Sequence, residues 1–119
     1  DRNLTAVGAL VGTPFYMAPE VIEGAAASPA SDLFGLGGLL YAVAVGRPPF
    51  AGQTVAAVFR SVCETVPTPL RQIRPDLPVW FEEMVLQLLA KNPRDRLTSA
   101  GEVAELAAAR SAPEVARSA

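Results

Sequence analysis

The residues best suited to chemistry form one run, G-T-P-F-Y-M-A-P-E, over positions 12–20. The opening glycine allows the backbone a turn that a side chain would forbid, and Pro14 favours an extended Thr13. The run therefore predicts a loop that presents its backbone and the Thr13 hydroxyl. Pro19 suits the first turn of a short helix, where the Glu20 carboxylate meets the positive end of the helix dipole.

The rest of the chain offers little other catalytic chemistry. It contains no His, which excludes Ser-His-Asp and Cys-His sites within it, and no residues have metal-ligand spacing, so no metal site is expected. Lys91 is the only lysine and ends an amphipathic helical pattern, and Cys63 lies in another such pattern, where it is expected to pack in the core. The G-L-G-G run over residues 35–38 follows no strand and lacks the spacing of a phosphate-binding turn, so it indicates close helix packing.

Composition indicates one well-packed globular piece. Half of the 119 residues are hydrophobic and 18% are charged, which excludes a disordered tail. The formal net charge of −2, without any Lys/Arg cluster, predicts no contact with nucleic acid or with an anionic membrane surface. One cysteine allows no internal disulfide, and no signal peptide precedes the first motif, so a cytoplasmic location is expected, although the parent protein could be membrane-anchored outside this segment.

Helical patterns dominate the chain, and no convincing strand is found. Residues 1–19 predict a loop, followed by a short helix over residues 20–23. Asp32 is expected to cap a helix over residues 33–45, which is apolar on nearly every side and is therefore predicted to be buried. The other expected elements are helices over residues 53–64 and 79–91, a proline-rich connection over residues 67–78, and a last helix from the S-A-G-E capping box at residues 99–102 to about residue 110.

Three motifs together resemble the protein kinase family. The run at residues 12–20 resembles the end of a kinase activation segment. S-D-L-F-G-L-G-G-L-L-Y at residues 31–41, followed by G-R-P-P-F at residues 46–50, resembles the central helix of the C-terminal lobe and the turn that leaves it. K-N-P-R-D-R-L-T at residues 91–98 resembles a loop near the end of that lobe. The sequence of the first motif is similar to that of Hanks-type serine/threonine kinases rather than tyrosine kinases. Alanine is abundant and arginine outnumbers lysine, which favours a bacterial source.

The resemblance implies both a fold class and a domain organisation. The expected fold is mainly α, with residues 1–110 forming part of the C-terminal lobe of a kinase domain whose complete fold is α+β. Residues 111–119 are expected to be a tail or a linker stub. The chain begins at Asp1 without a methionine and directly in loop-like sequence, so we expect a fragment of a longer protein.

The resemblance also implies the residues of a substrate-facing loop. Thr13 would support the catalytic aspartate of the kinase and help to select serine and threonine substrates. Thr5, in the polar-to-small sequence before this loop, is expected to be an activation-loop phosphosite. The residues expected to receive the substrate residue after the phosphoacceptor are Gly12, Thr13, Pro14, Phe15 and Tyr16.

Further implied roles support the loop from below. Asp32 would accept backbone N–H groups of the catalytic loop. Glu20 and Arg96 would form a largely buried ion pair that fastens the substrate-facing loop to the base of the lobe. Gly35 departs from the family, many of whose members have serine there, and this costs about 1 kcal/mol of helix propensity relative to alanine.

ATP and Mg²⁺ are the cofactors implied for the parent kinase. The catalytic Asp, the metal-binding Asp and the ATP-binding Lys would all precede Asp1, so this chain alone is expected to bind neither cofactor and to transfer no phosphate. The implied partners are protein substrates with Ser or Thr and the missing N-terminal part of the kinase domain.

Two alternatives stay open at this point. The first is a catalytically inactive kinase-like scaffold that binds protein partners, and the second is an unrelated helical interaction domain. H-R-D-x-x-x-x-N and D-F-G motifs upstream of Asp1 would favour the enzyme, and their loss would favour the scaffold. A structure without a central buried helix surrounded by the others would favour the unrelated domain.

Overall fold

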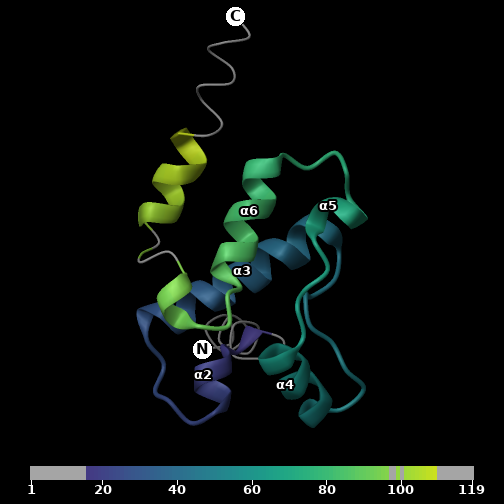
Figure 1. Cartoon of the computed structure of the whole chain (residues 1–119), viewed down its shortest axis with the longest axis vertical. Helices are drawn as coiled ribbons and strands as arrows, with labels where there is room; N and C mark the ends of the chain where they lie inside the picture. Colours follow the sequence, from purple (N-terminus) through teal and green to yellow (C-terminus); the bar gives the residue numbers. More distant parts are fainter. Residues whose placement is uncertain (1–15, 97–98, 100, 110–119) are drawn as a thin grey trace, which may run out of the picture.

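The computed structural model describes residues 16–96, 99 and 101–109, and this part of the chain is helical with no strand (Figure 1). The expected mainly α fold is therefore confirmed. In chain order the elements are α2 (Pro19–Ile22), α3 (Pro29–Val45), α4 (Val55–Glu64), α5 (Leu70–Ile73), α6 (Val79–Leu88) and the 3-10 turn η2 (Pro93–Asp95), followed by a helix over residues 101–109.

The longest helix, α3, begins earlier than the sequence analysis predicted. Ser28, and not Asp32, is its N-cap: the Ser31 backbone N–H donates to the Ser28 hydroxyl at 3.2 Å, and the Ser28 N–H donates to the Ser31 hydroxyl at 2.7 Å. Pro29 occupies the first helical position, where its missing N–H has no cost. This reciprocal cap wins because it satisfies two donors, and Asp32 therefore lies within the first turn. Gly46, with φ of 85°, ends the helix as expected.

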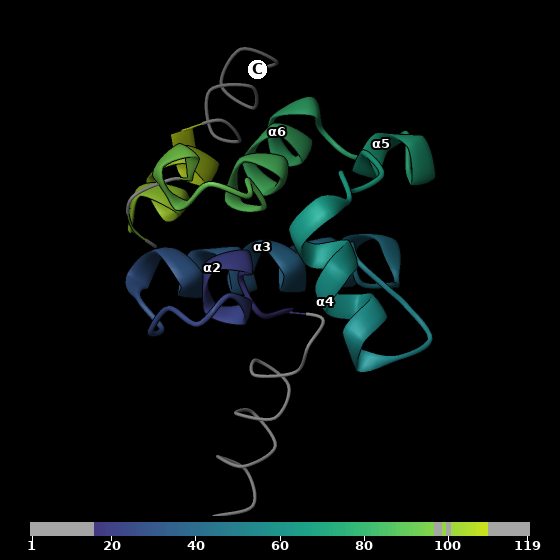
Figure 2. The ribbon, with the colours of Figure 1, turned by 60° about the horizontal axis from the view of Figure 1, so that its bottom comes forward.

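The helices form two layers that meet at α3. Figure 1 shows α6 crossing α3, and Figure 2 shows α6 and the helix over residues 101–109 on one side of α3. Both α5 and the η2 turn also pack against α3, while α2 and α4 pack against each other. The arrangement has a central helix, α3, that α5, α6 and the η2 turn contact, which counts against an unrelated helical domain.

Two apolar clusters hold the layers together. Phe34 of α3 and Phe50, which follows the turn after α3, stack with ring centroids 6.0 Å apart and planes 8° apart. Both rings are completely buried, so the polypeptide leaving α3 folds back onto it. The larger cluster contains Ala18, Phe34, Tyr41, Phe50, Val58, Val62, Leu70, Val85 and Leu89, and the smaller one contains Leu33, Met84, Leu88 and Val103.

Close packing between α3 and α6 depends on a glycine. A Cβ atom placed on Gly37 would lie 2.7 Å from the Leu88 Cβ and 3.3 Å from two atoms of Leu89. Real Cβ atoms do not approach one another so closely, so only glycine allows this helix separation. The predicted role of the glycine-rich run in helix packing is confirmed at this position.

One prediction about α3 is wrong, because the helix is not buried on every side. Val43 is 77% exposed, and Leu36 and Leu39 are partly exposed. These residues lie on one edge of α3 at helical spacing, since they are three and four positions apart. The described part of the chain therefore leaves an apolar edge of its central helix without a covering element.

Helix α4 also differs from expectation at its start. Thr54 is its N-cap and accepts a hydrogen bond from the Ala57 N–H at 3.0 Å, so Gln53 lies outside the helix. Val58 and Val62 face the core, but Val55 is 57% exposed although its spacing matched theirs. Cys63 is only partly buried, and desolvation raises the pKa of its thiol.

Two further differences concern the segment from residue 67 to residue 91. The proline-rich connection contains the single-turn helix α5, and Tyr41 of α3 donates its hydroxyl hydrogen to the Thr68 carbonyl at 2.7 Å, which fixes the connection on the core. Burial raises the pKa of this Tyr41 hydroxyl. Helix α6 ends at Leu88 instead of Lys91, since the Ala90 N–H donates to the Gln87 carbonyl, three residues back, and the α-helical pattern stops there. The Ala90 and Lys91 carbonyls accept hydrogen bonds from Arg96. Among the described helices, none has the length and apolar character needed to cross a membrane.

Candidate functional site

The charged centre of the structure is the guanidinium of Arg96, whose side chain is fully shielded from solvent. Its Nη1 lies 2.7 Å from Glu20 Oε2, and its Nη2 lies 2.9 Å from Glu20 Oε1, so two parallel hydrogen bonds join the pair. The three other guanidinium donors bond to backbone carbonyls: Nε to Ala90 at 2.8 Å, Nη1 to Ala30 at 3.0 Å and Nη2 to Lys91 at 3.2 Å. All five donors of Arg96 are therefore satisfied, which is the condition for burying this charge.

The partner carboxylate of Glu20 lies at the edge of the core. Its side chain is 20% exposed, and it lies in the first turn of the single-turn helix α2, where a negative charge is favourable. Hydrogen bonding to the Arg96 guanidinium lowers the pKa of Glu20, against the opposing effect of burial. The pair is consequently ionised at neutral pH and connects α2 to a loop 76 positions later in the chain.

Local sequence explains how Arg96 reaches this position. The Asn92 side chain accepts the Arg94 N–H at 3.0 Å, and Pro93 starts the η2 turn, so the chain reverses tightly after α6. The turn directs Arg96 beneath Phe34 of α3, with the guanidinium carbon 5.0 Å from the ring centroid. The same residue thereby contacts α2, α3 and the segment that follows α6.

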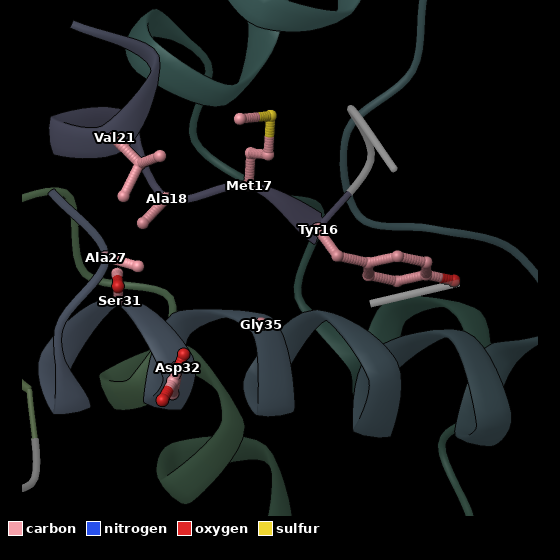
Figure 3. A pocket seen from close by; sticks show the side chains of 8 residues that line it. All are labelled: Tyr16, Met17, Ala18, Val21, Ala27, Ser31, Asp32 and Gly35. Atoms are coloured by element: carbon pink, nitrogen blue, oxygen red, sulfur yellow. The ribbon is translucent and has the colours of Figure 1, made fainter. Parts of the chain in front are cut away.

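An open pocket of about 230 Å³ lies beside this ion pair, between the segment that leads into α2 and the first turns of α3. Figure 3 shows the segment that carries Tyr16, Met17 and Ala18 lying opposite α3, with the Met17 side chain directed away from that helix. Gly35 lies next to this segment: a Cβ placed there would be 3.4 Å from the Tyr16 carbonyl oxygen, an ordinary contact distance, so the approach does not require glycine. The complete lining is Tyr16, Met17, Ala18, Val21, Ala27, Ser31, Asp32 and Gly35.

Asp32 gives this mostly apolar pocket its charge. It lies in the first turn of α3 and is exposed, and its carboxylate has no hydrogen-bond or ion-pair partner within residues 16–96, 99 and 101–109. Figure 3 shows its carboxylate on the α3 side of the pocket. Such a carboxylate is free to accept N–H donors from a polypeptide segment placed there.

Most of the predicted substrate-facing loop precedes the first described residue, Tyr16. Thr5, Gly12, Thr13, Pro14 and Phe15 lie outside the described residues. Of that loop only Tyr16 is described, and it is partly buried at the pocket. Of the predicted site residues, the structure therefore pairs Glu20 with Arg96 in an ion pair and places Tyr16 and Asp32 in the lining of the same pocket.

Sequence reasoning missed the role of Lys91. Its Nζ donates to the Val62 carbonyl at 2.5 Å and lies 3.9 Å from the centroid of the Phe50 ring. Burial lowers the pKa of this amine to about 8. No sequence signal connects position 91 with positions 50 and 62, although a single lysine at the end of an apolar pattern was visible. The described residues include no group of three or more side chains able to hold a metal ion.

Comparison with known proteins gives the same assignment as the geometry. A family model of the protein kinase domain matches residues 2–108. Over 106 residues the chain is 43% identical to the DNA damage-responsive serine/threonine-protein kinase RqkA of Deinococcus radiodurans, covering 88% of this chain and 16% of that protein. It is 34% identical over 107 residues to the serine/threonine-protein kinase PknE of Mycobacterium tuberculosis, covering 90% of this chain and 19% of that protein.

A solved structure agrees. The autoinhibited serine kinase domain of the giant muscle protein titin superimposes with a TM-score of 0.69 at 28% identity, covering 77% of this chain and 28% of that chain. The helices and the ion pair thus define the C-terminal lobe of a kinase fold. The chain belongs to the protein kinase domain family, and the resemblance to bacterial serine/threonine kinases is confirmed. It spans less than a fifth of the length of the two bacterial relatives.

Proposed function

We propose that this chain is the substrate-supporting part of a serine/threonine protein kinase, which transfers the γ-phosphoryl group of ATP to serine or threonine side chains of other proteins. The observation that carries the proposal is the five-donor burial of Arg96 against Glu20. That pair fixes the segment from Tyr16 to Glu20 to the base of the lobe. Phosphoryl transfer depends mainly on positioning and on charge stabilisation, and a rigid support for the substrate-facing loop supplies positioning.

Asp32 has the second role in this proposal. Its unpaired carboxylate and the adjoining pocket form a binding surface for the catalytic loop of the kinase. The carboxylate would accept hydrogen bonds from backbone N–H groups of that loop. The exposed apolar edge of α3, which ends at Val43, offers a surface for the rest of the missing N-terminal part of the domain. ATP and Mg²⁺ would bind that part, where they supply the phosphoryl group and neutralise its charge, and no step of that binding involves the residues of this chain.

The partners and location that we propose follow from the same assignment. The partners are proteins that present Ser or Thr, together with the N-terminal part of the kinase domain, and neither nucleic acid nor a membrane surface is a partner of this segment. We place the kinase domain in the cytoplasm, where ATP is available, and a membrane anchor elsewhere in the parent is compatible with this. Thr13 would then support the catalytic aspartate, with residues 12–16 receiving the substrate.

The test is a phosphate-transfer assay on the complete kinase domain that contains this chain. Incubation with MgATP and a mixture of Ser, Thr and Tyr peptides should phosphorylate only Ser and Thr. Asp32→Asn should lower kcat by about tenfold to a hundredfold, because a displaced catalytic loop misaligns the reacting atoms. Asp76→Asn, at an exposed aspartate far from the pocket, is the matched control and should leave kcat unchanged.

Two outcomes would overturn this proposal. Tyrosine phosphorylation at a rate equal to that of serine would contradict the substrate class. A folded complete domain that lacks the H-R-D and D-F-G motifs and transfers no phosphate would favour the inactive scaffold. In such a scaffold Asp32 would have only a structural role.

A further inference from the structure

The side chain of Lys91 joins two parts of the molecule that the chain keeps apart. Its Nζ donates to the carbonyl of Val62, near the end of α4, and rests on the ring of Phe50. Its backbone carbonyl accepts Nη2 of Arg96 at 3.2 Å. Lys91 therefore contacts α4 through its side chain and the buried Arg96 guanidinium through its backbone carbonyl.

The contact with Val62 satisfies a need of α4. This helix ends at Glu64, and the Thr65 N–H donates to the Ser61 carbonyl, so the Val62 carbonyl is among those left without an amide donor inside the helix. A lysine from another segment supplies that donor and places its positive end at the negative end of the helix dipole. No side-chain cap from α4 itself does so.

The contact with Phe50 makes this position rigid. Phe50 is fully buried and stacks on Phe34 of α3, and Arg96 lies against the other aromatic ring of that stack. Lys91 and Arg96 thus hold the same pair of rings from two sides of the turn that follows α6. A displacement of either cation changes the support of the other.

We propose that Lys91 is a positioning residue that locks α4 to the Glu20–Arg96 pair, and thereby holds the substrate-facing segment against α4. This rests on the proposed function for its effect on substrate, while the mechanical link stands on contacts alone. The link closes through α2, which carries Glu20 and packs against α4. Loss of the Lys91 donor should therefore loosen both α4 and α2.

The first test is hydrogen exchange of the complete kinase domain, in the variants Lys91→Met, Lys91→Arg and Arg60→Met. Lys91→Met keeps an apolar stem but loses the donor, and Lys91→Arg keeps a cationic donor. Arg60→Met, at an exposed position of α4, is the matched control for loss of a positive charge. Lys91→Met should lower the protection of the last α4 amides and of the α2 amides by about fivefold or more. Lys91→Arg should retain most of the wild-type protection. Arg60→Met should change the protection of neither helix.

The second test is the KM for a protein substrate. Lys91→Met should raise this KM by a similar factor and leave kcat unchanged, because the residue touches no reacting group. Faster exchange in α4 alone, with α2 unchanged, would overturn the link, as would equal effects of Lys91→Met and Arg60→Met. A wild-type domain that transfers no phosphate would overturn the proposed function, and the exchange result would still decide the link. If Lys91→Met does not fold, Lys91→Arg is measured alone. Lower protection of the α4 amides with unchanged protection of the α2 amides, or the reverse, would then refute the link.

Discussion

The buried pair of Glu20 and Arg96 gives the sharpest quantitative prediction. Glu20→Gln keeps the shape of the side chain but removes its charge, which leaves the fully buried Arg96 guanidinium opposite neutral acceptors only. Stranding a buried charge costs about 3–5 kcal/mol. Arg96→Met should cost about as much, because three backbone carbonyls lose their donor and the Glu20 carboxylate loses its partner.

The assay is urea denaturation of the complete kinase domain as the two single variants and the double variant. Once one partner is gone, removing the other should cost less, so the coupling energy should be about 1–3 kcal/mol. The matched control is Asp76→Asn, which breaks the Arg74–Asp76 ion pair, whose side chains are 46% and 65% exposed. That change should cost far less than Glu20→Gln, because solvent screens exposed pairs.

The pair also sets a pH dependence. Because the pKa of Glu20 is lowered in the folded protein, its contribution is complete above the unfolded carboxylate value of about 4.3 and is lost as the pH falls through the folded value. Acid unfolding of Glu20→Gln should lack this component. A coupling energy near zero, or a Glu20→Gln cost equal to that of Asp76→Asn, would refute the reasoning.

Four other predictions follow. Gly37→Ala should cost about 1–3 kcal/mol in urea denaturation, because its Cβ would meet Leu88, whereas Gly101→Ala, whose Cβ would find only ordinary contact distance, should not destabilise. Between pH 8 and about 10.4 the folded chain binds fewer protons at Lys91 than the unfolded chain, so the free energy of unfolding of the wild type relative to Lys91→Met should rise by about 1 kcal/mol, after discounting for the partial exposure of this amine. Both proteins are compared in the Cys63→Ala background, because the charges of Lys91 and Cys63 shift each other's pKa. Calorimetry of the 119-residue chain with MgATP should show no saturable micromolar binding, since the nucleotide-contacting motifs are not in its sequence. Mass spectrometry of the active parent should find phosphate on Thr5, and phosphate found only elsewhere in the loop would contradict this.

The sequence predicted the partners of the ion pair and most of the helices, because both follow from motifs or from periodicity. The sequence prediction was wrong at the start of α3, where two different residues could cap the helix. Asp32 had good N-cap chemistry, but Ser28 with Ser31 offers two reciprocal bonds, and Pro29 fits only a helix that starts there. It also failed at α5, because a single turn is too short for periodicity to be read.

The long-range contacts of Lys91 were beyond sequence reasoning for a different reason. Its partners, Val62 and Phe50, are 29 and 41 positions away, and neither a carbonyl nor a ring at that separation has a local signature. The exposed Val43 has the converse explanation: apolarity all round α3 predicts burial, but burial requires covering elements, and none of the described residues covers that edge.

The separation of 76 positions between Glu20 and Arg96 also has a consequence for biosynthesis. Contacts between distant residues form late, since the intervening chain must first be ordered. At synthesis rates of about 5–20 residues per second, Arg96 is made about 4–15 s after Glu20. During that interval the nascent chain contains Glu20 but not Arg96, so the segment that we propose to face substrate is not yet held by this ion pair.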